Sequence, residues 1–535
     1  MKPEIYLGLD SSTQGVTAVL WDAGRREAVR IASLNYGRDL PHYGCPKGVL
    51  PSADPAVAHA PPGMWAEGLD VLLARLRADG APLESVRALA VSAQQHGSVY
   101  LNAHAAERLA GLRWDADLPL QISDILSRRT SPIWMDASTS EECAEIRRAM
   151  GGKRAVIEAT GSNTFERFTG PQIRAFWKRE PAAYASTAHI ALVNSFLTSL
   201  LIGRLAPLEP GDAAGMNLMD IRARDWHEGA LNATAPDLRR RLPAIVPSDT
   251  VAGPVAPWLT RRHGLARDVP AVVGTGDNPS SLVGLGLIEP EWMAVSLGTS
   301  DTCFRLLEEC RTDARGEGHV FGAPTGGYFT LLCFQNGSLA RERVRDRFGL
   351  DWDGFTEAIR STPPGNNGRM MLPWFSPEIV PRVRHPRPFY RGLDPADAAA
   401  HCRAIVESQM LAMRVHAQWM GGPPRGIRVT GGASANPEIR RIMADVMGCP
   451  VYHAPVTNSA ALGAAIRAAH AERRARGEPA SWEELAAPPP GAKSPPPLEP
   501  DPVAHRVYER MAAEYAEWER QAWEEIEGAA DDETP

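Results

Sequence analysis

The sequence predicts an α/β protein, because strand-like and helix-like segments alternate along most of the chain. Short apolar runs such as 86–92 and 270–274 end in small polar turns, which is typical of buried strands. Longer segments of helical character, such as 65–77 and 138–150, lie between the predicted strands. Strands and helices that alternate in this way pack as layers around a sheet.

Two predicted β-hairpins that lie far apart in the sequence indicate two lobes. In each one an apolar run is followed by a turn of small polar residues and a second apolar run. The strands are expected at 5–10 and 16–21, and again at 292–297 and 302–307, with turns at 11–15 and 298–301. Because the same pattern occurs twice, we expect each lobe to begin with a hairpin and place the boundary near residues 280–290.

The expected division of the chain is therefore an N-terminal lobe at 1–285, a C-terminal lobe at 286–480 and a tail at 481–535. In the tail, the Pro-rich segment 488–500 is typical of a stiff linker. Apolar residues then recur at helical spacing from Val503 to Trp518, which predicts a final amphipathic helix. The acidic residues at 531–533 are expected to form a frayed end.

Composition excludes several classes of protein. The 535 residues include 57 Lys and Arg against 64 Asp and Glu, and 44% of them are hydrophobic. These values exclude a disordered chain, a collagen and a small disulfide-bonded scaffold. A formal net charge of −7 provides no field that would attract nucleic acid or an anionic membrane. The oligomeric state is not legible from the sequence.

Cysteine usage, the first residues and the longest apolar stretch favour a cytoplasmic protein. Seven cysteines without a C-x-x-C pair fit a reducing compartment, and the first residues lack the layout of a signal peptide. The longest apolar stretch, 190–202, contains four polar residues and is too short to span a bilayer, so a buried helix is expected. No H-E-x-x-H motif or Cys/His cluster indicates a tightly held metal.

Three turns of small residues, at 11–15, 298–301 and 431–434, directly follow predicted strands. The strand before the third turn is expected at 427–430 and the helix after it at 438–447. Backbone N–H groups in such turns can approach a phosphate closely. Neither a Walker A loop nor a G-x-G-x-x-G motif is present, and one such turn alone is usually only a turn. Three of them in one α/β chain favour nucleotide binding.

Two carboxylates, Asp10 and Asp277, stand at the ends of predicted strands. The ordinary interpretation is a helix cap, and Asn278 followed by Pro279 fits a cap with Pro at the first helical position. That interpretation leaves Asp277 without a structural task. Phosphoryl transfer would use both acids, one to help hold Mg²⁺ and one to accept the proton of the attacking hydroxyl.

Three further residues have an ordinary structural interpretation beside a functional one. His96 follows Gln94 and Gln95 in a loop whose donors and acceptors suit a polyol, although a lone His is usually structural. Arg167 would by default be a surface charge paired with Glu166, and Trp352 would by default be a core residue.

Ten segments in order along the chain resemble the FGGY family of carbohydrate kinases. They are Leu-Asp-Ser-Ser-Thr-Gln at 9–14, Gln-Gln-His-Gly-Ser at 94–98, Ser-Pro-Ile-Trp-Met-Asp at 131–136, Glu-Arg-Phe-Thr-Gly at 166–170, Gly-Met-Asn-Leu at 215–218, Thr-Gly-Asp-Asn-Pro at 275–279, Ser-Leu-Gly-Thr-Ser-Asp-Thr at 296–302, Asn-Gly-Ser-Leu at 336–339, Thr-Gly-Gly-Ala-Ser at 430–434 and Asn-Ser-Ala at 458–460. Within the family, the segments at 94–98 and 166–170 are most similar to the branch that phosphorylates D-xylulose.

The resemblance implies a two-lobed actin-like ATPase fold of the ribonuclease H-like type, with ATP and sugar meeting in a cleft between the lobes. It implies that Asp277 is the general base, that His96, Arg167, Asp277 and Asn278 contact the sugar, and that Asp10 lies near Mg²⁺. Ser12, Thr13, Gly298 and Thr299 match the phosphate-binding positions, while Trp352, Gly431, Gly432, Ala433 and Asn436 match the adenosine-binding positions. One departure is Thr17, where many members of the family carry Lys or Arg.

The expected function is thus Mg²⁺- and ATP-dependent phosphorylation of D-xylulose at O5. Two alternatives remain open at this point. One is the same chemistry on another ketopentose or a polyol, because the stereochemistry of one hydroxyl can depend on a single side chain. The other is a non-catalytic sugar or nucleotide sensor or an actin-like assembly protein. Retention of Asp10 and Asp277 beside the sugar-loop residues disfavours this second alternative.

Overall fold

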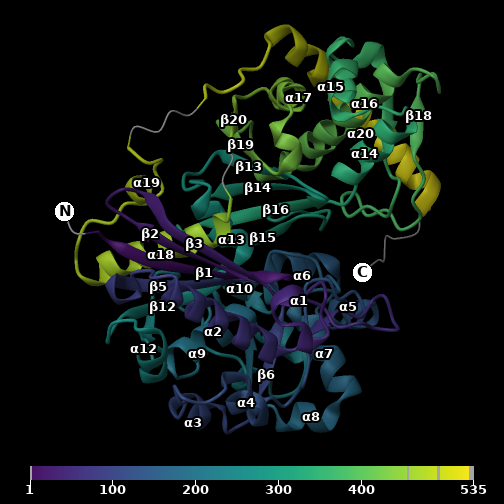
Figure 1. Cartoon of the computed structure of the whole chain (residues 1–535). Coiled ribbons are helices and arrows are strands. Elements are labelled where there is room, and N and C mark those ends of the chain that lie inside the picture. Colours follow the sequence, from purple (N-terminus) through teal and green to yellow (C-terminus); the bar gives the residue numbers. More distant parts are fainter. Residues whose placement is uncertain (1–2, 455–456, 491–494, 529–535) are drawn as a thin grey trace. The chain divides into compact units, whose positions relative to one another are not determined.

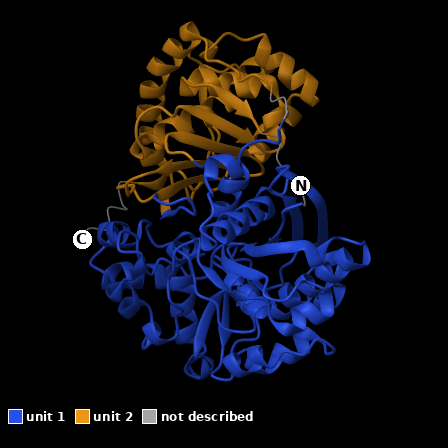
Figure 2. Cartoon of the chain, turned by 90° about the vertical axis from the view of Figure 1, so that its left-hand side faces the viewer, with its two compact units in different colours: residues 1–288, 321–327, 457–492 blue, residues 289–320, 328–456, 493–535 orange. Residues whose placement is uncertain are grey.

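The computed structural model describes residues 3–454, 457–490 and 495–528 and forms two compact units (Figures 1 and 2). The first unit comprises residues 1–288, 321–327 and 457–492, and the second comprises 289–320, 328–456 and 493–535. The predicted acidic tail at 531–533 lies outside the described residues. No helix in the described part of the chain is both long and apolar enough for a bilayer crossing.

The first unit is built on a six-stranded mixed sheet with the order β11-β12-β5-β1-β2-β3. Its strands are β1 (Ile5–Ser11), β2 (Gly15–Asp22), β3 (Glu27–Asn35), β5 (Val86–Ala93), β11 (Val251–Pro254) and β12 (Pro270–Gly276). Strands β1 and β2 form the predicted first hairpin, with Ile5 opposite Asp22 and Ser11 opposite Val16. Strands β5 and β12 run parallel to β1 and form the next two positions in the sheet.

Helices cover both faces of this sheet. Alternate residues of β1 point to opposite faces, so Ile5, Leu7 and Leu9 pack in a cluster with helices α2 (Pro62–Ala78) and α9 (Val193–Ile202). Tyr6 belongs to a second cluster with helix α18 (Ser459–Ala475). The remaining helices and strands of this unit are α1 (Tyr36–Asp39), α3 (Ala105–Ala110), α4 (Leu118–Ile122), α5 (Ser140–Ala149), α6 (Lys153–Thr160), α7 (Thr169–Arg179), α8 (Pro181–Ser186), α10 (Pro210–Ala213), α11 (Glu228–Thr234), α12 (Pro257–His263), α13 (Asp277–Gly284), α19 (Trp482–Leu485), β4 (His59–Ala60), β6 (Ser98–Leu101), β7 (Ser131–Pro132), β8 (His189–Leu192), β9 (Met219–Asp220) and β10 (Asp225–Trp226).

Glycines allow α18 to approach the sheet and helix α13 at backbone distance. A Cβ atom placed on Gly8 of β1 would lie 1.9 Å from the Ala461 carbonyl oxygen, and one on Gly463 would lie 1.8 Å from that of Ser280. The Ser280 hydroxyl donates to the Ala460 carbonyl oxygen at 2.7 Å, which fixes the two helices together. Helix α13 is therefore held by α18 immediately after it leaves β12.

The second unit has another six-stranded sheet, with the order β15-β16-β14-β13-β19-β20. Five of its strands repeat the topology of the first sheet, whereas the sixth, β15, lies at the opposite edge from the one that β11 occupies there. An antiparallel β16-β14-β13 set is followed by β19 and β20, which run parallel to β13. Helix α16 is almost wholly buried, and α17 and α20 pack against it. The elements are β13 (Trp292–Leu297), β14 (Asp301–Leu307), β15 (His319–Gly322), β16 (Tyr328–Phe334), β17 (Met370–Leu372), β18 (Phe389–Arg391), β19 (Gly426–Thr430), β20 (Val451–His453), α14 (Ser338–Arg347), α15 (Trp352–Arg360), α16 (Ala398–His416), α17 (Pro437–Met447) and α20 (Pro502–Glu527).

Most predicted elements are confirmed, and three details differ. The stretch 190–202 is buried as expected, but it begins in strand β8, and helix α9 starts only at Val193. Helix α13 begins at Asp277 with Gly276 as its cap, so Asn278 lies inside the helix and is not its cap. Residues 457–492 belong to the first unit, not to a C-terminal lobe at 286–480, because α18 packs on β1 and β5. Helix α20 then belongs to the second unit.

The close approach of α18 predicts the effect of adding one methyl group. Gly→Ala inside a helix normally stabilises it, but Gly463→Ala would place Cβ against the Ser280 backbone. We expect the variant to lose about 2–3 kcal/mol of unfolding free energy, measured by urea denaturation. Gly111→Ala is the control, because its Cβ would lie at an ordinary 3.4 Å from the Glu107 carbonyl oxygen. An unchanged midpoint for Gly463→Ala would contradict this account of the packing.

Candidate active site

The carboxyl ends of three parallel strands bring the two predicted acids to one edge of the first sheet. In the register of β1, β5 and β12, Ser92 lies beside both Asp10 and Thr275. Asp277 follows two residues after Thr275, where β12 passes into α13. Residues from the start and the middle of the sequence therefore meet at the edge where α/β sheets commonly bind ligands.

Asp10 is half-buried at the end of β1 and is held by the Ser92 hydroxyl, which donates to its Oδ1 at 2.8 Å. Burial, followed by the negative charge of Asp277, raises the pKa of Asp10 to about 7. Thr17 lies opposite Asp10 in the hairpin, and its hydroxyl is hydrogen bonded to Ser33 at 3.0 Å. No cation from this position thus neutralises Asp10, which keeps the carboxylate available to a ligand.

Asp277 is the first residue of α13 and is also half-buried. Burial raises its pKa to about 6, while backbone amides of Asn278, Gln95 and Asp277 itself oppose the shift. The Asn278 amide donates to Oδ1 at 2.8 Å. Because its pKa lies below 7, this carboxylate is mostly ionised at neutral pH and can accept a proton.

Gln95 connects the loop after β5 to the start of α13. Its side-chain oxygen accepts a hydrogen bond from the Asn278 Nδ2 at 2.8 Å, and its backbone amide is bonded to Asp277. Gly276 has no room for a side chain, since a Cβ there would lie 2.3 Å from the Gln95 Cγ. Asn278 is thereby oriented beside Asp277.

His96 adopts a left-handed backbone conformation with a φ of 70° and is 9% exposed. Its Nδ1 lies 2.8 Å from the Gly215 carbonyl oxygen, and its own carbonyl oxygen accepts from the Thr169 hydroxyl at 2.9 Å. Burial and then the nearby Arg167 lower the pKa of His96 to about 3, so the ring is neutral. A carbonyl oxygen only accepts, so Nδ1 carries the hydrogen and Nε2 is left as an acceptor.

Arg167 lies in the loop before α7 and is half-buried, with its guanidinium 5.7 Å from the Phe165 ring centroid. Among the described residues, no carboxylate lies within 4 Å of the Arg167 guanidinium. The default pairing with Glu166 therefore does not occur. Its charge acts on His96 instead, so the structure brings these two predicted sugar-contacting residues together.

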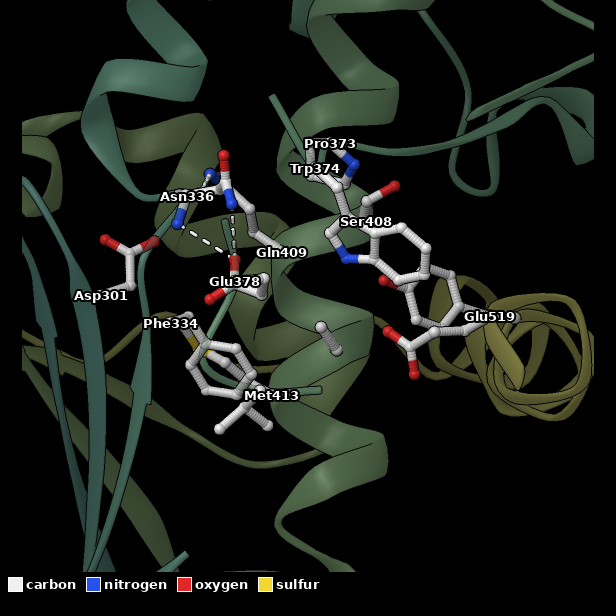
Figure 3. A pocket seen from close by; sticks show the side chains of 13 residues that line it. Asp301, Phe334, Asn336, Pro373, Trp374, Glu378, Ser408, Gln409, Met413 and Glu519 are labelled. Carbon is white, nitrogen blue, oxygen red and sulfur yellow. Dashed lines mark hydrogen bonds between the residues drawn. The ribbon is translucent and has the colours of Figure 1, made fainter. Parts of the chain in front are cut away.

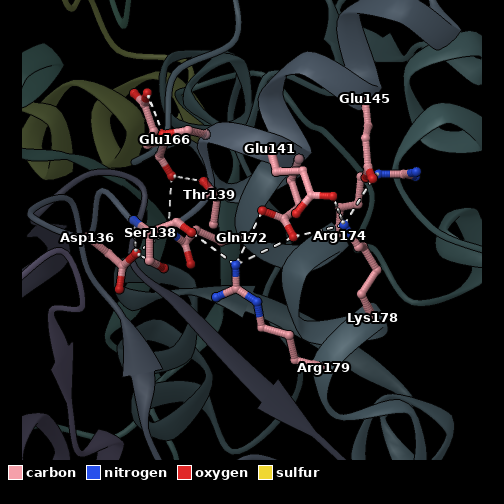
Figure 4. A network of polar contacts seen from close by, with 12 residues as sticks. Asp136, Ser138, Thr139, Glu141, Glu145, Glu166, Gln172, Arg174, Lys178 and Arg179 are labelled. Atoms are coloured by element: carbon pink, nitrogen blue, oxygen red, sulfur yellow. Dashed lines mark hydrogen bonds and ion pairs between the residues drawn. The ribbon is translucent and has the colours of Figure 1, made fainter. Parts of the chain in front are cut away.

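A network of buried polar groups fixes the loop that carries Arg167 (Figure 4). The Glu166 carbonyl oxygen accepts from the Thr139 hydroxyl at 2.7 Å and from the Gln172 Nε2 at 2.9 Å. The same Gln172 nitrogen donates to the Asp136 Oδ1 at 2.8 Å. Asp136 follows Trp134 and Met135, so this network joins two of the segments noted in the sequence.

Glu209 binds the end of strand β12 and was not predicted from the sequence. Its fully buried carboxylate accepts from the hydroxyls of Thr275, at 2.5 Å, and Ser248, at 2.7 Å. It also accepts from the backbone amides of Gly211 and Asp212. The only local signal is an acid before Pro210, typical of a helix cap, and nothing in it indicates a bond to β12.

The first predicted phosphate turn is closed by hydrogen bonds from its own residues and from Trp134. The Ser12 hydroxyl donates to the Gly15 carbonyl oxygen at 3.1 Å. The exposed Trp134 donates its Nε1–H to the Thr13 hydroxyl oxygen at 2.8 Å. Trp134 therefore connects this turn to the network around Asp136, a contact that sequence spacing alone does not reveal.

In the second unit, a buried polar pair lies close to the turn at Gly298 and Thr299 in the sequence. Arg341 makes two hydrogen bonds to Asp301, at 2.8 and 2.9 Å, directly after the turn. Asn336 donates to the Glu378 carboxylate at 2.9 Å. Asp301, Asn336 and Glu378 line a cavity (Figure 3) with a volume of about 20 Å³, which suits a single water molecule and excludes a nucleotide.

The predicted adenosine-binding residues also meet within the second unit. Gly431 has a φ of 88°, and a Cβ there would lie 2.4 Å from the Leu297 carbonyl oxygen, so only glycine fits beside the Gly298 turn. Gly432 and Ala433 follow in a short 3₁₀ helix. Asn436 caps α17 and donates to the Thr356 hydroxyl at 2.8 Å. This bond brings helix α15 to the loop, and α15 begins at Trp352, which is 42% exposed and not a core residue.

Asp10 can supply one ligand to a Mg²⁺ ion that arrives bound to a nucleotide. Within the described ranges, no group of three or more His, Cys, Asp or Glu side chains could hold a metal by itself. Mg²⁺ in phosphoryl-transfer sites typically takes one or two carboxylates and completes its shell with substrate phosphates and water. The half-buried carboxylate of Asp10, bonded to Ser92, is of this kind.

Two family models match this chain and together cover most of it. The N-terminal domain of the FGGY family of carbohydrate kinases matches residues 5–284, and the C-terminal domain of that family matches 293–472. Among curated proteins, a xylulose kinase from Rattus norvegicus is 38% identical over 533 residues and covers 98% of each chain. Xylulose kinase 2 from Arabidopsis thaliana is 38% identical over 489 residues and covers 87% of each chain.

Solved structures confirm the expected fold class. The xylulose kinase from Rhodospirillum rubrum superimposes with a TM-score of 0.82 at 19% sequence identity, covering 98% of this chain and 100% of that chain. The α/β content, the two units and the repeated sheet topology agree with a two-lobed actin-like ATPase fold.

The environment of His96 predicts its titration. We expect ¹⁵N NMR of histidine-labelled protein to show a neutral ring, protonated at Nδ1, throughout pH 5–8. In Arg167→Ala the pKa of His96 should rise, because a nearby positive charge is removed, yet stay below 6.5 because burial is the larger cause. The exposed Arg148→Ala provides a control with the same change in charge. A His96 ring that is protonated at pH 6 would contradict this assignment.

Proposed function

Because the chain belongs to the FGGY family of carbohydrate kinases, we propose that it transfers the terminal phosphoryl group of ATP to O5 of D-xylulose. The products are D-xylulose 5-phosphate and ADP. The observation that carries the proposal is the ionisable, half-buried Asp277, held by Asn278 and Gln95 at one sheet edge. The similarity to proteins named xylulose kinase over nearly the whole chain supports the choice of sugar.

Asp277, His96, Asn278 and Arg167 each have a task in the proposed reaction. Asp277 accepts the proton of the sugar O5 hydroxyl as that oxygen forms its bond to phosphorus, and the bond to the ADP oxygen breaks. The proton then leaves Asp277 for solvent. The Nε2 of neutral His96 accepts a hydrogen bond from a sugar hydroxyl, and Asn278 and Arg167 donate hydrogen bonds to sugar oxygens.

The nucleotide is assigned to the turns of small residues that the sequence indicates. Backbone amides of the turns at Ser12–Thr13 and Gly298–Thr299 bind phosphate oxygens, where developing charge is stabilised. Trp352, Gly431, Gly432, Ala433 and Asn436 hold the adenosine end. Asp10 would hold Mg²⁺, which supplies charge neutralisation on the phosphates when bound.

The substrate is tested by an ADP-release assay with Mg²⁺-ATP and a panel of sugars. We expect D-xylulose to give a kcat/KM at least tenfold above those of L-xylulose, D-ribulose and xylitol, and little ADP release without sugar. Higher turnover on another member of the panel would retain the kinase and overturn the sugar. Sugar-independent ADP release from folded protein would favour the sensor alternative.

The base assignment is tested by Asp277→Asn, which preserves the shape of the side chain and removes the proton acceptor. We expect kcat to fall by about 10³-fold while the affinity for ATP changes little. The exposed Asp268→Asn is a matched control and should keep the wild-type rate. Turnover by Asp277→Asn within tenfold of the wild type would exclude Asp277 as the base.

A further inference from the structure

We propose that the second unit carries an additional binding site, for a small polyhydroxylated molecule with one oxyanion group, in a groove beside Arg305. The groove has a volume of about 700 Å³, within the range of metabolite-binding sites. It lies where β14 ends and where β13 and β19 begin, so it is at the opposite end of the β13–β14 hairpin from the Gly298 turn.

The floor of the groove contains a buried positive charge with few partners. Arg305 is only 6% exposed, and its Nη1 donates to the Gly422 carbonyl oxygen. Its Nε is buried and has no hydrogen-bond partner. Within the described part of the chain, no carboxylate lies within 4 Å of the Arg305 guanidinium. A buried charge left in this condition is costly, and an anionic ligand would compensate it.

The guanidinium groups of Arg311 and Arg305 both lie near Gly421. A Cβ placed on Gly421 would lie 3.2 Å from Arg311 Nη1 and 3.8 Å from Arg305 Cζ, so both cations border the space above this glycine. A Cβ on Gly422 would meet nothing within 4 Å, which leaves the groove open beside them. Burial, with a further contribution from Arg311, lowers the pKa of Arg305. Two cations brought together around open space form a fork that suits an oxyanion.

The rim restricts the kind of molecule that can bind. Glu291, Glu308 and Glu309 are exposed around the groove, whereas Glu289 is paired with Arg425 at 3.3 Å. An acidic rim repels a highly charged anion such as a nucleoside triphosphate. Carboxylates do accept hydrogen bonds from hydroxyl groups. The charges therefore select a monophosphate or a carboxylate on a neutral, hydroxyl-rich body.

Calorimetric titration of the full chain tests the site with ribose 5-phosphate, gluconate and ribose as probes. We expect ribose 5-phosphate or gluconate to bind, and the stronger of the two identifies the oxyanion as phosphate or carboxylate. Arg311→Ala should weaken that binding at least tenfold, and Arg305→Met should abolish it. The exposed Arg261→Ala, which makes the same change in charge in the first unit, should leave it unchanged.

Several results would overturn the proposal. The first is ribose binding as tightly as either anion, or no anion binding at 10 mM. The second is binding that Arg311→Ala leaves intact. The third is binding lost equally in Arg167→Ala, which would locate it at the catalytic edge. Arg305→Met should also keep or raise the melting temperature without ligand, because it removes a poorly compensated charge. A large fall in the melting temperature would show that other groups already compensate the charge of Arg305. Arg311 is exposed, so it can be replaced without disturbing the core.

Discussion

The parallel alignment of β1, β5 and β12 is the constraint on which the first unit depends. It places Asp10, Ser92 and Thr275 at one level and lets Asp277 follow immediately beyond them. A slip of β1 by one residue would turn the Asp10 side chain toward the face covered by α2 and α9. The register is secured on the other face by α18, whose backbone touches β1 at Gly8.

Bringing two carboxylates together at a half-buried edge is unfavourable, and the surrounding groups limit that cost. Backbone amides and the start of α13 stabilise the ionised form of Asp277, whereas Asp10 has only the Ser92 hydroxyl, so its pKa is raised further. His96 stays neutral, so no second positive charge is buried beside Arg167. At this edge Asp277 can therefore accept a proton, Asp10 can bind a cation, and the neutral His96 can accept a hydrogen bond.

Most strands and helices could be predicted from the sequence because the signals for them lie in neighbouring residues. Both hairpins, β5, β12, α17 and α20 follow directly from apolar periodicity and turn residues. The predicted start of α13 was wrong because Asn278–Pro279 fits a helix cap locally, whereas the cap in the structure is the extended Gly276. Ser92, Gln95 and Glu209 act through neighbours that only the folded sheet brings near, so no spacing reveals them. The assignment of residues to adenosine binding rests on family resemblance, and Trp352 by itself indicated only a core residue.

The contribution of residues 457–492 to the first unit has a consequence for synthesis on the ribosome. The sheet and α13 are complete by residue 288, but α18, which covers one face of them, ends at Ala475. At about 5–20 residues per second, the nascent chain waits roughly ten to forty seconds between these points. During that interval the small-residue face around Gly8 and Gly284 has no helix over it. A chaperone that meets the nascent chain in this interval therefore meets a face that the folded protein keeps covered.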